Sequence, residues 1–436
     1  MSNKLKKLAA SALAIPGMVA TTHAAGPAGS EASYRYTYYT EDDSPAARDD
    51  SGGAQDRYKI QVHQFHILSP VADKYAVSVE GSYESMAGAS PVYSYIPAGE
   101  DAVYAHFNGA SRENRYDLNV AGRYYASTSE LGSGIYASME RDYFALSASV
   151  DGSMQFNQQM TTLSGGMSVG HDWLNPNSGM LDDSDNVLMG NDLSDTQLQQ
   201  LAAENPARFA AIGQTKSQIS VFEGIGQIID MNTVMQASVS FTYKNGYLSD
   251  PYRDCVGSGI SDNVPCDIRP SSRAMGTLSL GVRRYLPNLD AAVHVDYRLL
   301  ADSWDIFSNT LDVDYYQNWA PNWNFFSKNG IAFQVVPGIR YYQQTAAYFY
   351  EIPDVNSTSG AVYTVDSTTY YSSDPRLSGY GAIAFKTKLK IDYKQFSLNA
   401  AAERYAGNPA YGFNFDEDIP GLPAYWRFTT GLDYRF

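Results

Sequence analysis

Charged residues recur at every second position in several segments of the chain, with apolar residues between them. The pattern is clearest in residues 74–84, 115–125 and 289–299. Alternate residues of a β-strand lie on the same face, so each segment predicts a strand with one charged and one apolar face. Charged groups that face the inside of a pore can set its ion selectivity. The residues that we expect to line such a pore are Glu80, Glu84, Arg115, Asp117, Arg123, Arg283, His294, Asp296, Arg298, Lys386, Lys388 and Lys390.

Two interpretations of these charges remain open. Because both signs occur, the side chains could select ions, or they could pair across the lumen and hold the wall rigid or closed. Lys386, Lys388 and Lys390 form a ladder of one sign on one predicted strand, which could attract anions. The same ladder could instead only neutralise Asp392, Glu403 and the acidic residues near them.

Catalysis finds little support in the sequence. An outer-membrane hydrolase needs a nucleophile or an activated water beside a base, and no motif places a serine as the partner of His294. His63 and His66 are three residues apart on a predicted strand, so they lie on opposite faces. No glycine-rich phosphate loop or zinc-ligand spacing occurs. We therefore expect no enzymatic activity, no catalytic residue and no cofactor.

The loops carry two further groups that could bind ions or each other. Acidic clusters at 41–43, 182–185 and 416–418 could take calcium, but the second cluster lacks the glycine and the distal glutamate of an EF-hand loop. Solvated charge is the favoured interpretation, and we expect no metal site. Cys255 and Cys266 lie close together in a polar stretch, which predicts a loop-closing disulfide in an exported chain.

The chain begins with a segment typical of export. Three lysines precede a short apolar run, residues 8–20, and Thr22-His23-Ala24 offers small residues at the positions that a signal peptidase recognises. The apolar run is too short to cross a bilayer as a helix. We predict that residues 1–24 are a cleaved signal peptide and that residues 25–436 form the mature domain.

About sixteen stretches of alternating residues follow, each roughly ten residues long, as expected of the strands of a membrane barrel. They lie near 32–40, 57–68, 74–86, 113–126, 132–141, 143–156, 160–173, 215–229, 232–244, 273–286, 289–302, 306–319, 330–345, 378–393, 395–406 and 425–436. No apolar run approaches the length of a membrane helix.

Short and long connections alternate between these stretches. The short ones are 69–73, 127–131, 157–159, 230–231, 287–288 and 393–394. The long, polar ones are 41–56, 87–112, 174–214, 246–272, 346–377 and 407–424. Short periplasmic turns and long extracellular loops are typical of bacterial outer-membrane barrels. The sequence therefore predicts an all-β, transmembrane, antiparallel up-and-down barrel in the outer membrane of a Gram-negative bacterium.

Aromatic residues mark the expected membrane boundaries and the end of the chain. All five tryptophans fall at predicted strand ends, where an aromatic girdle would lie. The last strand, 425–436, is amphipathic and carries Tyr434 and Phe436 on its apolar face. This ending resembles the signal that outer-membrane proteins present to the barrel-assembly machinery, which we expect as a partner together with outer-membrane lipid and lipopolysaccharide.

The connection 174–214 holds the only helical pattern. Ser194 and Gln197 resemble a capping box, and Asn205-Pro206 could begin a second short helix. We expect a partly helical extracellular loop, which could fold into the mouth and narrow it or cover the barrel from outside.

Several fragments, in this order, resemble one bacterial family, that of domain of unknown function 3570. They are Tyr34-Arg-Tyr36 with Glu41-Asp42, 83–91, Asn245-Gly-Tyr-Leu-Ser-Asp-Pro-Tyr252, Asp296-Tyr-Arg298, Tyr371-Ser-Ser-Asp374 with Arg376-Leu377, and Glu403-Arg-Tyr405. The resemblance spans nearly all of the mature chain. It implies an outer-membrane barrel and assigns no activity to any residue; 174–214 and the cysteine pair look like local additions.

Two classes of function remain. With 47 acidic and 31 basic residues the net charge is −16, which argues against nucleic acid as a partner. A polar, charged inner face favours a passive, porin-like channel for small polar or ionic solutes. The alternative is a non-conducting scaffold or receptor that docks a periplasmic or lipoprotein partner. Whether the lumen is open or closed decides between the channel and the scaffold.

Overall fold

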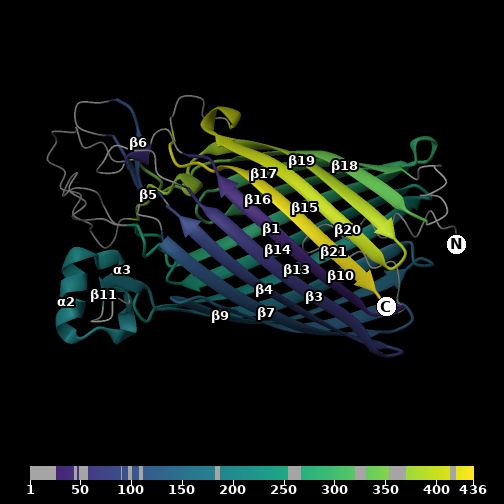
Figure 1. Ribbon diagram of the computed structural model, residues 1–436, viewed down its shortest axis with the longest axis horizontal. Coiled ribbons are helices and arrows are strands. Elements are labelled where there is room, and N and C mark those ends of the chain that lie inside the picture. Colours follow the sequence, from purple (N-terminus) through teal and green to yellow (C-terminus); the bar gives the residue numbers. More distant parts are fainter. Residues whose placement is uncertain are drawn as a thin grey trace.

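The computed structural model describes residues 26–43, 47–48, 57–89, 91–96, 101–107, 111–181, 187–253, 267–319, 330–352, 370–412 and 419–436. In this part of the chain sixteen antiparallel strands pair with their sequence neighbours and close into a barrel (Figure 1). The number of strands and their up-and-down order confirm the predicted fold class. None of the described helices is long and apolar enough to cross a membrane.

The strands follow one another around the barrel, and β21 pairs with β1 to close it. They are β1 (Glu31–Glu41), β3 (Lys59–Ala72), β4 (Tyr75–Gly88), β7 (Ser111–Tyr125), β8 (Ser129–Met139), β9 (Tyr143–Phe156), β10 (Thr161–Leu174), β13 (Thr215–Asp230), β14 (Thr233–Gly246), β15 (Ser272–Leu286), β16 (Ala291–Asp302), β17 (Phe307–Trp319), β18 (Ala332–Gln344), β19 (Tyr380–Tyr393), β20 (Phe396–Asn408) and β21 (Ala424–Arg435).

Smaller elements occupy the connections. A three-stranded sheet contains β2 (Ala47–Arg48), β5 (Pro91–Tyr95) and β6 (Tyr104–Phe107), and a two-stranded sheet contains β11 (Asn177–Leu181) and β12 (Val187–Met189). The helices are η2 (Gly190–Asp192), α2 (Asp195–Glu204), α3 (Pro206–Ala211), η3 (Pro287–Leu289), η4 (Pro375–Leu377) and η5 (Pro409–Tyr411). Figure 1 shows β5, β6, α2 and α3 at the end of the barrel away from the two chain termini.

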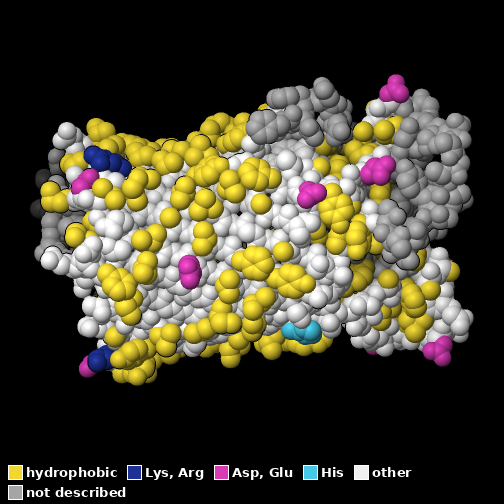
Figure 2. All heavy atoms as spheres, turned by 180° about the vertical axis from the view of Figure 1, so that it is seen from behind, with side chains coloured by type: hydrophobic (Ala, Val, Ile, Leu, Met, Phe, Trp, Pro, Cys, Tyr) yellow, Lys and Arg dark blue, Asp and Glu magenta, His cyan; other side chains and the backbone are white. Residues whose placement is uncertain are grey.

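The outer face of the barrel is apolar. Large side chains that alternate with inward-facing polar residues are exposed there, and Ile67, Ile135 and Phe385 are all more than half exposed. Figure 2 shows one side of this face, where hydrophobic side chains predominate and charged ones are few. A closed barrel with an apolar belt suits lipid outside and water inside. The chain is an outer-membrane β-barrel.

The connections mostly alternate in length as predicted, although β17 and β18 are separated by twelve residues, 320–331, at the end where the turns are otherwise short. At the end that holds both termini, β3 joins β4 through residues 73–74, and β13 joins β14 through 231–232. At the other end, β10 joins β13 through forty residues, 175–214. Two extracellular turns are short, however: 140–142 and 303–306. The long extracellular loops therefore come from only part of the rim.

Three tryptophans confirm the expected girdle, because they are exposed near strand ends: Trp173, Trp319 and Trp426. The prediction is wrong for Trp304, which is 3 % exposed. Its ring packs edge-on against Phe349, 5.1 Å between centroids, and its Nε1 donates to the carbonyl of Ser272 at 3.0 Å. An extracellular loop folds over this turn and buries the indole. Trp323 lies outside the described residues.

The connection between β10 and β13 contains two helices where the sequence favours them. Ser194 caps α2: its hydroxyl accepts from the amide of Gln197, and the Gln197 side chain accepts from the amide of Ser194 at 3.0 Å. Asn205 caps α3, which begins at Pro206. Figure 1 shows both helices beyond the end of the barrel wall.

Candidate functional site

The inner face of the barrel carries the twelve residues that the sequence assigns to a pore. On β4, for example, Glu80 and Glu84 alternate with Val77 and Val79, which are exposed on the outer face. The strand register brings many of the twelve into ion pairs with neighbours. Whether they line a conducting path stays a prediction.

One half of the inner wall, from β15 to β21, holds a dense set of ion pairs. Lys386 contacts Asp312, and its Nζ lies 3.1 Å from Oδ1 of Asp314. Arg340 Nε donates to the other oxygen of Asp312 at 2.8 Å. Gly338 leaves room for this group, because a Cβ there would lie 1.9 Å from Asp314 Oδ1. A small residue in β18 therefore positions the charges of β17 and β19.

Two more pairs extend this set. Arg283, 2 % exposed, lies 2.7 Å from Asp296 Oδ1, and Arg427 lies 2.6 Å from Glu403 Oε2. Together with Arg298 these side chains line one cavity of about 540 Å³. The cavity is bounded by seven strands, β15 to β21, and its lining runs from Ser279 to Arg427 along the chain.

The three lysines of the predicted ladder have three different environments. Lys386 is held by two aspartates of β17, and Lys390 Nζ lies 3.0 Å from Asp392. Lys388 is exposed to the lumen and has no ion pair with any described residue. Glu403, one of the carboxylates that the ladder could neutralise, pairs with Arg427 instead. The ladder is therefore not a uniform strip of positive charge.

One stretch of the remaining wall, on β9, β10, β13 and β14, carries more hydroxyl groups than charges. Ser149, Ser168, Ser220 and Thr242 lie opposite one another across β9, β10, β13 and β14, and the hydroxyls of Ser220 and Thr242 are 2.9 Å apart. Small hydroxyl side chains offer hydrogen bonds without net charge. The lumen thus has a charged side and a hydroxyl-lined side.

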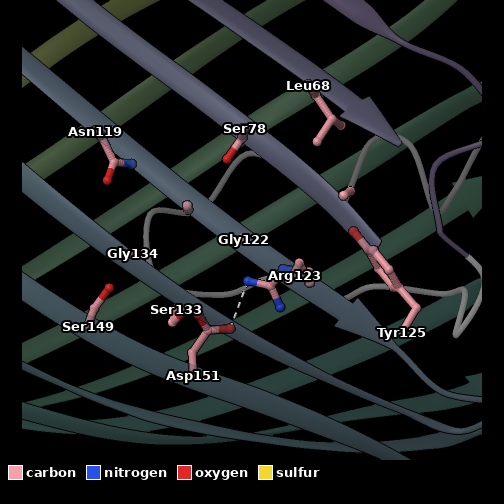
Figure 3. A pocket seen from close by; sticks show the side chains of 12 residues that line it. Leu68, Ser78, Asn119, Gly122, Arg123, Tyr125, Ser133, Gly134, Ser149 and Asp151 are labelled. Carbon is pink, nitrogen blue, oxygen red and sulfur yellow. Dashed lines mark hydrogen bonds and ion pairs between the residues drawn. The ribbon is translucent and has the colours of Figure 1, made fainter. Parts of the chain in front are cut away.

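Charged residues reappear toward β4 and β7. Arg123 reaches Glu130 at 3.1 Å and Asp151 at 2.8 Å; Figure 3 shows the latter bond beside a cavity of about 250 Å³. Arg115 pairs with Glu84 at 3.0 Å. The other two predicted residues here are also in place: Asp117 accepts a hydrogen bond from Ser82, and Glu80 faces Asn119 on the next strand.

A row of inward tyrosines was not foreseen from the sequence. Tyr405 and Tyr425 stack with centroids 4.8 Å apart, Tyr39 lies 4.6 Å from Tyr425, and Tyr342 lies 5.7 Å from Tyr380. Tyrosine is typical of the lipid boundary of a membrane protein, whereas these rings face the lumen. The sequence does contain a signal for one of them. Tyr405 is two residues from the inward-facing Glu403 on the same strand, and residues two apart in a strand share one face.

Above the charged wall, extracellular loops meet around one buried carboxylate. Asp374 is 1 % exposed and lies 3.0 Å from Arg253, 3.0 Å from Arg269 and 2.7 Å from Arg376. Burial by itself would raise the pKa of Asp374, but these three guanidinium groups hold it well below the usual range of a carboxyl. The contact joins the β14–β15 and β18–β19 loops.

Other loops reach across the mouth to join this contact. Tyr252, from the β14–β15 loop, donates to Asp142 in the β8–β9 turn. The amide of Ser94, in the β4–β7 loop, donates to Ser373 at 3.2 Å. Arg57, in the β1–β3 loop, donates to the carbonyl of Gly421 at 3.3 Å. We call residues 247–253, 267–270 and 371–378, with the loops that bond to them, the cap; it links loops from around the rim.

The sequence does not predict that the residues of the cap contact one another. Asp374, Arg376 and Tyr252 belong to fragments that carry the family resemblance, whereas Arg253 and Arg269 carried no motif. Loops so far apart in the chain can be brought together only by the closed ring of strands. Four predicted features lie outside the described residues: the disulfide of Cys255 and Cys266, the acidic clusters 182–185 and 416–418, and the signal peptide.

Solved structures of outer-membrane proteins share the barrel at low identity. A bacterial polysaccharide outer membrane secretin is 10% identical, with 93% of this chain and 98% of that chain covered and a TM-score of 0.45. CdiB from Acinetobacter baumannii is 10% identical (94% and 60% covered, TM-score 0.47), and opdK from Pseudomonas aeruginosa is 9% identical (93% and 98%, 0.35). Likeness at this level extends to the fold alone.

No curated protein sequence matches the chain. One family model does match, and it covers residues 5–431, nearly the whole length. The resemblance stated from the short fragments is thereby confirmed. The chain belongs to the family described as "Protein of unknown function (DUF3570)".

Proposed function

We propose that the barrel is a passive, porin-like channel for small polar or ionic solutes. The observation that carries this is a pair of adjoining cavities along the charged wall. A cavity of about 700 Å³ toward the periplasmic end shares Tyr316, Lys386, Lys388 and Glu403 with the cavity of about 540 Å³ above it. A sixteen-stranded barrel encloses a water-filled lumen unless something fills it.

The two-sided lumen suggests how such a channel would discriminate between solutes. Ion pairs on β15–β21 and hydroxyl groups on β9–β14 create a transverse field across the path. Solutes with separated charge or many hydroxyl groups would be favoured over apolar ones.

The test is the single-channel conductance of the refolded barrel in planar bilayers, over a range of salt and at both polarities. Stepwise currents with a measurable ion preference are expected. The protein must first be shown to be folded by circular dichroism and protease resistance. If it then carries no current, the result contradicts an open channel.

The cap favours a second candidate, a non-conducting barrel that docks a periplasmic or lipoprotein partner. Asp374 and three arginines join the β14–β15 and β18–β19 loops. Tyr252 and Ser373 bond these loops to the β8–β9 turn and the β4–β7 loop, so bonded polypeptide crosses the extracellular mouth. A covered mouth on a rigid wall suits a scaffold as well as a gated channel.

Removing the central carboxylate separates the two candidates. In Asp374→Asn the three arginines lose their shared partner, so a gated channel should conduct more than the wild type. Asp230→Asn is the matched control, because it removes an exposed carboxylate that pairs with Arg284 at the other end of the barrel. If both variants and the wild type are silent in bilayers, the scaffold is favoured.

A further inference from the structure

The cavity of about 540 Å³ is net positive inside an acidic protein. Six cationic side chains and four carboxylates line it, whereas the chain as a whole has a net charge of −16. Each of the four carboxylates is paired, with Arg283, Arg340, Lys386 or Arg427. Arg298 and Lys388 are the two cations left over.

Both of these cations are free to meet a solute. Their side chains are exposed to the lumen, and neither has an ion pair or hydrogen bond with any described residue. They come from β16 and β19 and line the same cavity. Uncompensated cations in a confined space attract anions more strongly than the same groups on an open surface.

A buried imidazole points to the same ligand chemistry. His294 is 2 % exposed and lines this cavity, yet its Nε2 has no hydrogen-bond partner among the described residues. The ring is held against Tyr316, with centroids 4.1 Å apart. A buried polar atom without a partner is costly unless a ligand or water satisfies it. In the neutral tautomer that carries its hydrogen on Nε2, the ring would donate to an oxyanion.

We propose that this cavity binds a small organic dianion, held by Arg298, Lys388 and His294. The volume lies in the range of sites for small organic molecules and exceeds what a bare inorganic ion fills. Tyr342, Tyr380 and Tyr405 line the cavity too and offer ring faces to the carbon skeleton of the ligand. The inference rests on the proposed function, since it names the solute class of that channel.

The test is calorimetric titration of the refolded full-length barrel in detergent micelles with succinate, and with the uncharged analogue succinamide. Succinate should bind at millimolar or lower concentration and succinamide should not. Arg298→Gln with Lys388→Gln should weaken succinate binding by about tenfold or more. The matched control is Arg284→Gln, which removes a cation outside this cavity that pairs with Asp230 and should change binding by less than about twofold.

The two single variants are measured as well, in case the double variant does not fold. Equal binding by wild type and variants, equal binding of succinamide, or no binding by folded wild type would each overturn the proposal. Calorimetry measures binding without measuring current, so the two proposals can fail separately. A barrel that binds succinate but does not conduct refutes only the channel. A barrel that conducts but does not bind succinate refutes only the dianion site.

Discussion

Gly338 shows how one absent methyl group can position a cluster of charges. A Cβ at this residue would lie 1.9 Å from Asp314 Oδ1 and 3.1 Å from Lys386. Gly338→Ala should displace Asp314 and lower the free energy of unfolding by about 1–3 kcal/mol, measured by urea unfolding in lipid vesicles. Gly122→Ala is the control, since no atom lies within 4 Å of its added Cβ. Equal stability of the two variants would show that the cluster tolerates the methyl group.

Glu223 is an exception on the apolar outer face. It is exposed and lies between Val221 and Ile225 on the same face of β13, and these two residues are 43 % and 45 % exposed. A carboxylate facing lipid is unfavourable, so Glu223→Val should stabilise the barrel by about 1–2 kcal/mol in vesicles. The control is Ile225→Val, which leaves the polarity of the face unchanged. A destabilised Glu223→Val barrel would mean that the carboxylate has a favourable role in the membrane.

At the scale of the loops, the cap should resist mild acid. A carboxyl whose pKa is lowered by folding contributes stability above its unfolded pKa and loses that contribution only as the pH falls through the folded pKa. The pKa of Asp374 is lowered, so the carboxylate stays ionised well below about pH 4. Hydrogen exchange of residues 371–378, corrected for the intrinsic rate, should be the same at pH 7 and pH 5.

Loss of this protection at pH 5 in the wild type would show that another group controls the cap. Asp374→Asn should lack the protection at both pH values, which separates the ion pairs from the rest of the loop packing.

At the scale of the whole molecule, barrel closure depends on the last strand. β21 pairs with both β20 and β1, and Phe436 at its end is 60 % exposed and 5.4 Å from the Tyr434 ring. Because Phe436 packs little, Phe436→Ala should leave refolding in detergent unchanged. If the aromatic ending is the signal for the barrel-assembly machinery, the same variant should reduce the amount assembled into the outer membrane of cells. Phe396→Ala, which removes a ring 4.8 Å from Tyr434, is the control and should assemble normally.

Much of the barrel could be predicted because its information is local. The two-residue period of β4 or β16 sets which side chains share a face, and the hairpin turns set which strands are neighbours. Strand number, antiparallel order and the inward position of residues such as Asp296 and Lys388 follow from these two facts. The capping box of Ser194 and Gln197 is likewise contained within four residues.

Only the tertiary structure decided which inward charges are neutralised. Lys386 and Lys388 have the same local pattern. The register of β17 against β18, and of β18 against β19, places two aspartates beside Lys386. Lys388 has no ion pair with a described residue. The cap depends even less on local sequence, because Asp374 meets Arg253 and Arg269 over more than a hundred residues. Such contacts arise when sixteen strands close into a ring, because closure brings loops from separate hairpins to one rim. The two-residue repeat of a strand describes only its own side chains, so it cannot predict contacts between distant loops.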